Sequence, residues 1–268
     1  MKQQIKNFLG KNLAKIVKPY LPHPKSLNYK QPAPNTKSLI SKAARFVACE
    51  MIEGDYMEFG VYQGTSYINA YHALKQQFEN RISLKVGGQV ENSHQSKRKA
   101  IWENMRFIAF DSFQGLPSLE DQDLGTNDFD EGMYACSLDQ FQKNIAGAGL
   151  PEEKTLAVQG WFKDTCISQT AEKFQLNKAS IIWLDADLYS STKSVLDFIT
   201  DFLQDGTIII FDDWFSFKGS PYYGVQKAFY EWSSQPVVAD RFLVHEYQRE
   251  DWKRISFIIS EKPNNSSK

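Results

Sequence analysis

Two pairs of aspartates directly follow uninterrupted apolar runs, and this position favours metal chemistry. Asp185 and Asp187 come after the run IIWL, and Asp212 and Asp213 come after the run IIIF. If these runs form neighbouring strands, four carboxylates meet at one edge of a sheet and repel each other unless a cation or a proton offsets their charge. Hard oxygen ligands with no His or Cys nearby suit Mg²⁺ far better than Zn²⁺. The alternative is that one or two of them cap the following helices, with Asp187 as the best example, but capping does not readily explain two such pairs.

An earlier apolar run leads into a glycine-containing loop suited to ligand binding. Ligands of open α/β sheets bind outside the carboxyl ends of the strands. The run at 56–59 continues into Gly60 and Gly64, which allow a tight turn and a close approach of the backbone to a ligand. The helix that follows offers its N-terminal amides. The spacing is ExGxxxG, which differs from the GxGxxG of dinucleotide-binding turns.

Two further runs end in an acidic and in an aromatic residue. Asp111 follows the run at 107–110, where a carboxylate can accept both hydroxyl hydrogens of a ribose. The alternative is that Asp111 caps the next turn. Gly160 and Trp161 follow the run at 155–158, where the indole can flank a purine ring or simply fill the core.

The alternation of apolar runs and helical patterns predicts a sheet covered by helices. The runs are continuous, as expected of parallel strands buried on both faces. The last two strand candidates are joined by a short polar link, which permits only an antiparallel pair. The expected strands are 56–59, 107–110, 155–158, 181–184, 207–211, 241–247 and 254–260, and the expected helices are 65–79, 138–147, 165–175, 191–203 and 225–232. We therefore predict one doubly wound α/β domain over 41–262, followed by a polar tail at 263–268.

Two polar stretches interrupt this pattern. Residues 84–105 lie where a compact connection needs only a few residues, so we expect a mobile surface insertion there. Residues 117–132 hold six acidic side chains and no basic one. A solvated loop explains this composition, but the position after the carboxyl end of a strand also suits a lid.

Composition excludes several classes of protein. The chain has 268 residues, of which 42% are hydrophobic and 24% are charged, with a net charge of −1. These values are ordinary for a soluble globular protein and exclude disorder of the whole chain. No stretch approaches the roughly 20 apolar residues needed to cross a bilayer. Cys49, Cys136 and Cys166 form neither a CxxC pair nor a disulfide framework, so we expect a cytoplasmic location.

The first residues of the chain carry a charge of their own. Residues 1–49 contain nine Lys and Arg45 but no acidic residue, a charge of +10, so the remainder of the chain carries −11. An acidic body argues against nucleic acid as a partner. Residues 1–18 have the spacing of a basic amphipathic helix, and a Pro-rich linker completes an arm over 1–40. We expect the arm to pack on its own domain or on a second subunit of a homo-oligomer, with peripheral contact to an anionic membrane as the alternative.

Five blocks of the sequence together resemble the macrocin O-methyltransferase family. In the family's order, the blocks are GDYMEFGVYQGTS, AFDSFQGLP, VQGWFKDT, WLDADLYSST and GTIIIFDDW, and they lie within residues 53–230. Members of this family are class I S-adenosylmethionine (SAM) enzymes that methylate sugar hydroxyls of macrolides. The resemblance implies a Rossmann-like seven-stranded sheet with a reversed last strand, bound SAM, and Mg²⁺ or another hard divalent cation.

The resemblance also implies roles for individual residues. The SAM-binding residues would be Glu58, Gly60, Tyr62, Gly64 and Thr65 along the methionine and ribose, Asp111 and Ser112 at the ribose, and Gly160 and Trp161 beside the adenine. The metal ligands would be Asp185, Asp212 and Asp213.

A mechanism follows from these roles. Methyl transfer requires an oxygen nucleophile about 3 Å from the methyl carbon. We expect two vicinal hydroxyls of a small-molecule or glycan acceptor to chelate the metal, with Asp185 or Asp187 accepting the proton. Related catechol enzymes carry a lysine shortly after the first metal ligand, but Leu188 and Tyr189 occupy that neighbourhood here. The arm and the 84–105 stretch lie outside the resemblance, so the identity of the acceptor does not carry over.

Three other functions fit parts of the pattern. A non-catalytic partner protein could keep the SAM-binding fold. A nicotinamide-dependent oxidoreductase shares the sheet and the ribose carboxylate, but GxGxxG is missing and the paired aspartates have no role in it. A metal-dependent phosphotransferase or hydrolase could use the same carboxylates, yet the chain has no GxxxxGK[ST] loop.

Overall fold

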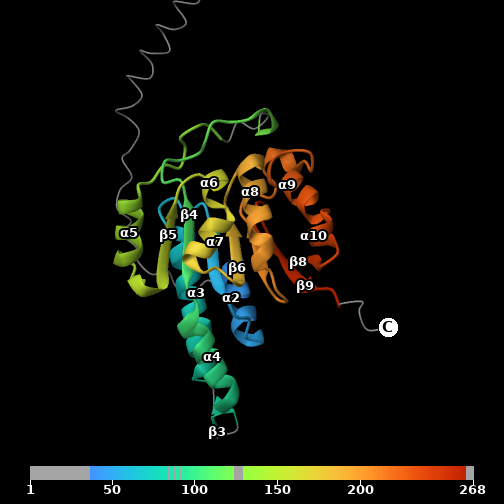
Figure 1. The fold of residues 1–268 in the computed structure, drawn as a ribbon. Helices are drawn as coiled ribbons and strands as arrows, with labels where there is room; N and C mark the ends of the chain where they lie inside the picture. Colours follow the sequence, from blue (N-terminus) through green and yellow to red (C-terminus); the bar gives the residue numbers. More distant parts are fainter. Residues whose placement is uncertain (1–36, 84, 87–88, 91, 124–128, 264–268) are drawn as a thin grey trace, which may run out of the picture.

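The computed structural model describes residues 37–83, 85–86, 89–90, 92–123 and 129–263 (Figure 1). The predicted helix at 1–18 and nearly all of the predicted arm and tail lie outside these residues. Their expected contacts with a second subunit or a membrane therefore stay predictions. Among the helices of the described part, none is long and apolar enough to cross a membrane.

The strands follow the predicted apolar runs and form one seven-stranded sheet. The sheet order is β5-β4-β1-β6-β7-β9-β8. The first five strands in this order are parallel, and β9 is antiparallel to both of its neighbours. The strands are β1 (Asp55–Phe59), β4 (Phe107–Asp111), β5 (Thr155–Gln159), β6 (Ala179–Leu184), β7 (Ile208–Phe211), β8 (Phe242–Glu250) and β9 (Arg254–Glu261). The prediction of a doubly wound α/β sheet with a reversed last strand is confirmed.

Helices bury both faces of this sheet. Alternate side chains of a strand point to opposite faces, and on β1 Met57 and Phe59 belong to one apolar cluster while Tyr56 belongs to the other. The first face is covered by α6 (Phe162–Thr165), α7 (Ser168–Phe174), α8 (Tyr189–Ile199), α9 (Gly224–Ser233) and α10 (Pro236–Ala239). The second is covered by α2 (Leu39–Glu50), α3 (Thr65–Ile82), α4 (Asn92–Asn104) and α5 (Leu138–Gly147). The continuous apolar runs of the sequence reflect this two-sided burial.

The stretch at 84–105 differs from its prediction as a surface insertion. It contains two short paired strands, β2 (Lys85–Val86) and β3 (Gln89–Val90), and then α4. Trp102 of α4 stacks on Phe78 of α3 with ring centroids 5.7 Å apart, and Ile101 is buried. Figure 1 shows α3 and α4 extending side by side away from the sheet. The second half of the stretch therefore belongs to a helical layer, which its mostly polar composition concealed.

The register brings the ends of the central strands to a common edge. Leu184 of β6 pairs with Phe59 on one side and with Phe211 on the other. The residues that follow these strands, including Asp185 and Asp212, therefore begin loops at the same edge of the sheet, as predicted.

Gly60 is required where β1 and β6 end against each other. Its φ is +87°, and a Cβ atom there would lie 1.9 Å from the carbonyl oxygen of Asp185.

We expect Gly60→Ala to lower the free energy of unfolding by at least about 3 kcal/mol, because both the backbone conformation and the contact with a main-chain atom oppose the methyl group. Urea denaturation measures this change. Gly149→Ala is the matched control, since Gly149 has φ +79° but a Cβ atom there would meet no heavy atom within 4 Å apart from its chain neighbours, and the change should cost only about 1–2 kcal/mol. Equal losses in the two variants would contradict the role of the close contact.

Candidate active site

A cavity of about 930 Å³ lies at the carboxyl edge of the sheet. The loops after β1, β4, β5, β6 and β7 all contribute to it. Its lining includes eight residues predicted from the sequence, namely Gly60, Tyr62, Asp111, Ser112, Trp161, Asp185, Asp187 and Asp212. The other predicted residues, Glu58, Gly64, Thr65, Gly160 and Asp213, are not part of its lining. The structure therefore gathers most of the predicted site around one space.

Asp111 ties the loop after β1 to the loop after β4. Its Oδ2 accepts hydrogen bonds from the backbone amides of Val61 at 2.8 Å and Tyr62 at 3.1 Å, and its Oδ1 accepts one from the amide of Phe113 at 2.7 Å. Burial raises the pKa of Asp111, against the opposing effect of these bonds. A carboxylate has about four acceptor positions, so roughly one remains for a ligand in the cavity. Ser112 mainly shapes its own turn, because its hydroxyl donates to Gly115 and accepts from the amide of Gln114.

Glu58 lies behind the cavity. Its side chain is fully buried, and its two carboxylate oxygens accept hydrogen bonds from the hydroxyls of Tyr56 and Ser66. Burial raises the pKa of Glu58 to about 8, although both hydrogen bonds lower it. Gly64 and Thr65 begin α3 close by, and Gly64 takes the left-handed conformation there. In this structure Glu58 links Tyr56 of β1 to Ser66 of α3, and its predicted contact with SAM stays a prediction.

The loop after β5 presents an aromatic side chain. Gly160 has φ +146°, and a Cβ atom there would meet the side chain of Thr165 at 2.7 Å. Trp161 follows it at the start of α6 and lines the cavity. The sequence left open whether this indole fills the core or contacts a ligand. Its place in the cavity lining favours contact with a ligand.

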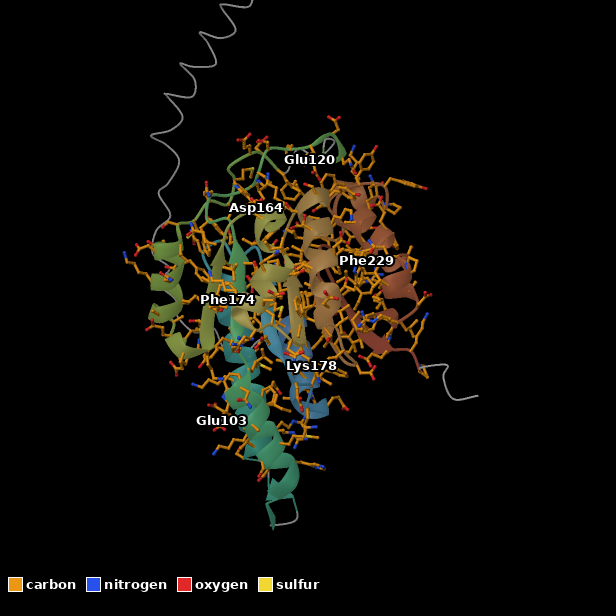
Figure 2. The ribbon with its side chains drawn as sticks, viewed as in Figure 1. Glu103, Glu120, Asp164, Phe174, Lys178 and Phe229 are labelled. Carbon is orange, nitrogen blue, oxygen red and sulfur yellow. The ribbon has the colours of Figure 1, made fainter. Side chains whose placement is uncertain are left out.

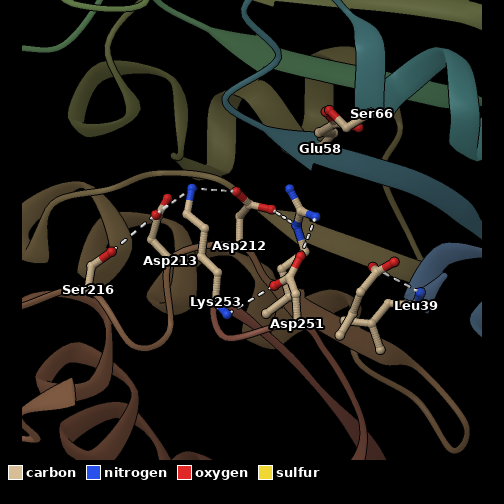
Figure 3. A network of polar contacts seen from close by, with 10 residues as sticks. Leu39, Glu58, Ser66, Asp212, Asp213, Ser216, Asp251 and Lys253 are labelled. Carbon is tan, nitrogen blue, oxygen red and sulfur yellow. Dashed lines mark hydrogen bonds and ion pairs between the residues drawn. The ribbon is translucent and has the colours of Figure 1, made fainter. Parts of the chain in front are cut away.

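Three carboxylates gather where β6 and β7 end. One oxygen from each of Asp185, Asp187 and Asp213 lies within 4.8 Å of the others. The predicted ligand set contained Asp212 instead of Asp187. In the structure both oxygens of Asp212 are engaged by basic side chains, since they accept from Lys253 at 3.1 Å and from Arg254 (Figure 3).

Asp187 does not cap the following helix. It has φ +56°, in the left-handed region, and Leu188 separates it from the start of α8. The amide of Tyr189, at the start of α8, donates at 2.6 Å to the buried carboxylate of Asp123. A non-glycine residue held in this conformation at a cavity is typical of functional sites, where the surrounding structure compensates the strain.

The electrostatics of the cluster favour a bound cation. Burial raises the pKa of Asp185, and the neighbouring carboxylates Asp212 and Asp213 raise it further. Burial and Asp185 likewise raise the pKa of Asp187. Burial would also raise the pKa of Asp213, but the hydrogen bond with Asp187 and the ammonium of Lys253 outweigh it and leave that pKa lowered. Without a further cation, protons must therefore offset part of this charge.

Lys253 and Arg254 could not be assigned to the site from the sequence. Lys253 lies in the turn between β8 and β9 and Arg254 is the first residue of β9, both far along the chain from the aspartates. Ile255 of β9 pairs with Phe211 of β7, so the turn that precedes β9 reaches the edge where β7 ends. A lysine is thus present at the carboxylates, although the segment that follows Asp187 offers none. The sequence predicted the strand pair that brings Lys253 and Arg254 to the site. It did not specify where in the sheet this pair lies.

The acidic stretch at 117–132 forms part of the cavity wall. Its lining residues are Pro117, Ser118, Leu119, Glu120, Glu131 and Gly132. Figure 2 shows Glu120 at the top of the view, beyond the ends of the strands. Asp123 anchors the stretch to α8 through the bond to Tyr189, while residues 124–128 lie outside the described part. Movement as a lid stays a prediction.

Comparison with known proteins identifies relatives of the chain. The family model described as macrocin-O-methyltransferase (TylF) matches residues 37–229. The chain is 26% identical over 174 residues to an 8-demethyl-8-(2,3-dimethoxy-alpha-L-rhamnosyl)-tetracenomycin-C 4'-O-methyltransferase of Streptomyces olivaceus, covering 63% of this chain and 56% of the relative. It is also 26% identical over 170 residues to a mycinamicin III 3''-O-methyltransferase of Micromonospora griseorubida, covering 61% of this chain and 56% of the relative. The chain thus spans little more than half the length of these curated relatives.

Solved structures show the same fold. The O-methyltransferase NovP is 18% identical, with a TM-score of 0.55, and the match covers 82% of this chain and 77% of NovP. The calicheamicin methyltransferase CalS11 is 19% identical, also with a TM-score of 0.55, and the match covers 82% of this chain and 76% of CalS11. At this identity the likeness speaks for the fold alone.

Proposed function

Because the chain belongs to the macrocin O-methyltransferase family, we propose that it transfers a methyl group from SAM to a hydroxyl of a sugar or glycosylated metabolite, with help from Mg²⁺ or another hard divalent cation. One observation carries the proposal. A single cavity joins the loops that suit SAM, around Asp111 and Trp161, to the carboxylates that suit a metal, around Asp185. The donor and the acceptor oxygen can therefore meet in one space.

The first half of the cavity fits SAM through polar and aromatic groups. Asp111 offers its remaining acceptor position to a ribose hydroxyl, and Trp161 offers a ring face to an adenine. Tyr62, with φ +44°, and Tyr134, with φ +59°, bring their rings to 5.9 Å from each other, and both line the cavity. When bound, SAM supplies a methyl group on a positively charged sulfur. These residues would orient it for in-line attack and keep water away from the methyl carbon.

The second half fits a hard divalent cation. The donors are all carboxylate oxygens, which Mg²⁺ prefers. The Oδ2 atom of Asp213 is buried, and no hydrogen-bond donor in the described part of the chain reaches it. A buried anionic oxygen without a partner is costly, so a cation beside it would remove that cost. When bound, the ion would act as a Lewis acid toward the acceptor hydroxyl.

Asp185 is suited to receive the proton of the acceptor hydroxyl. It directly follows β6 and lines the cavity. Without a cation, burial and then Asp212 and Asp213 raise the pKa of Asp185, and a bound cation would keep it ionised and able to accept a proton. The pKa of Asp187 is also raised, by burial and then by Asp185 and Asp213.

The test is methyl transfer by the full-length chain. Methyl-labelled SAM and Mg²⁺ would be incubated with a monosaccharide, a nucleotide sugar, a polysaccharide and a glycosylated metabolite. Mass spectrometry is expected to find the label on a hydroxyl of one acceptor class, with S-adenosylhomocysteine (SAH) formed in equal amount and with EDTA stopping the reaction. Labelled product that persists undiminished in EDTA would contradict the metal, and failure to bind SAM or SAH would contradict the proposal as a whole.

A further inference from the structure

Two tyrosine rings meet in the cavity, and both belong to residues with a left-handed backbone. Tyr62 has φ +44° and Tyr134 has φ +59°. Their ring centroids lie 5.9 Å apart at an interplanar angle of 79°, and both residues line the cavity. They stay 40% and 47% exposed, so this edge-to-face pair leaves ring surface open to a ligand. Non-glycine residues in this backbone conformation are typical of functional sites.

The backbone of each tyrosine is fixed by the loop after β4. The amide of Tyr62 donates to the carboxylate of Asp111 at 3.1 Å. Tyr134 follows a turn that pairs with the same loop, because the amide of Leu116 donates to the carbonyl of Met133 at 2.9 Å. The fold therefore brings the two rings together from segments that lie more than 70 positions apart in the sequence.

The tyrosine pair lies between the two halves of the cavity. The backbone of Tyr62 is bound to Asp111, the carboxylate proposed to hold the ribose. Burial raises the pKa of Tyr134, Asp187 raises it further and Lys253 lowers it, which indicates that this ring lies near the carboxylate cluster. In SAM the sulfur carries both the ribosyl group and the methyl group. If the ribose lies at Asp111 and the methyl group faces the carboxylate cluster, the sulfur lies between them, beside the two rings.

This sulfur carries a positive charge that needs a partner where water is excluded. Asp111 already accepts hydrogen bonds from three backbone amides, and the clustered carboxylates are assigned to the divalent ion. The face of an aromatic ring attracts a cation that lies within about 6 Å of the ring centroid. A tyrosine ring attracts the sulfonium in this way without adding a charge that would compete for the metal.

We propose that the ring of Tyr134, set against the ring of Tyr62, recognises the positive charge on the sulfur of SAM. The attraction acts on SAM but not on SAH, because SAH has a neutral sulfur. The ring thus favours binding of the donor over binding of the product. The hydroxyl of Tyr134 is not needed for this recognition. The inference rests on the SAM-dependent function proposed above.

The test compares three ligands by isothermal titration calorimetry of the full-length chain, at a fixed Mg²⁺ concentration and without an acceptor. The ligands are SAM, SAH and sinefungin, an analogue of SAM that carries an ammonium group in place of the methylated sulfur. Tyr134→Leu should weaken the binding of SAM and of sinefungin at least about fivefold and change the dissociation constant of SAH by less than about twofold. Tyr134→Phe keeps the ring and should behave as wild type.

Two further variants complete the comparison. Tyr134→Asn also removes the ring, and Asn tolerates the left-handed backbone well, so it should reproduce the result of Tyr134→Leu. Tyr222→Leu is the control, since Tyr222 is 78% exposed and is not part of the cavity lining, and it should leave all three dissociation constants unchanged. Thermal unfolding would verify that each variant folds.

Several results would overturn the inference. Equal weakening of all three ligands in the ringless variants would mean that Tyr134 only shapes the cavity, and unchanged binding of SAM would mean that it has no role in recognition. A loss in Tyr134→Phe as large as that in Tyr134→Leu would assign the effect to the hydroxyl. Each of these results would overturn this inference alone, while methyl transfer remained measurable. Failure of the wild-type chain to bind either SAM or SAH would overturn it together with the proposed function.

Discussion

Asp185→Asn is expected to lower kcat for methyl transfer by at least about 10³-fold. The change is nearly isosteric but removes one of the three clustered carboxylates, which is also the proposed proton acceptor. Asp185 both lines the cavity and contributes an oxygen to the cluster with Asp187 and Asp213. The effect should appear in kcat at saturating SAM, because the acceptor hydroxyl loses both its activation and its base.

Binding measurements distinguish this effect from misfolding. The SAH dissociation constant of Asp185→Asn should stay within about threefold of wild type if the SAM half of the cavity is intact. Asp197→Asn is the control, because Asp197 on α8 pairs with Lys193 and is exposed. A variant at Asp185 that retained more than a tenth of the wild-type kcat would contradict both of its assigned roles.

Glu58→Gln is expected to stabilise the protein at alkaline pH. In the folded chain burial raises the pKa of Glu58 from 4.5 to about 8, so the folded state holds a proton that the unfolded state loses. Stability from this proton is fully present below pH 4.5 and is lost as pH rises toward 8. Gln cannot ionise and avoids this loss. The difference in unfolding free energy between the variant and wild type should therefore grow in favour of Gln by about 4 kcal/mol from pH 5 to pH 9.

Urea denaturation of both proteins at several pH values measures this difference directly. All other titrating groups are shared by the two proteins, so their contributions cancel in the comparison. The partners Tyr56 and Ser66 can rotate their hydroxyls to suit an amide. A difference in unfolding free energy that is independent of pH would show that Glu58 is ionised in the folded state. The buried carboxylate would then need a cation, which the described residues do not supply.

Much of the fold follows from local patterns. The helix over 138–147 has the predicted bounds, and the strand predicted at 107–110 is only one residue longer in the structure. These patterns work because burial on both faces leaves a continuous apolar run, while burial on one face of a helix leaves a stripe. The rule that ligands bind at the carboxyl ends of strands then placed Asp111, Trp161 and Asp185 around one cavity.

Two features of the site that the sequence did not predict involve contacts between distant segments. Asp123 caps α8, for which Asp187 was the alternative considered from the sequence. Lys253 reaches Asp213 because β9 pairs beside β7. A single sequence reports how apolar each position is and how often that repeats along the chain. It does not report which strands become neighbours across the sheet. For a buried charged residue, the neighbouring strand determines which direction the side chain takes and which group it pairs with.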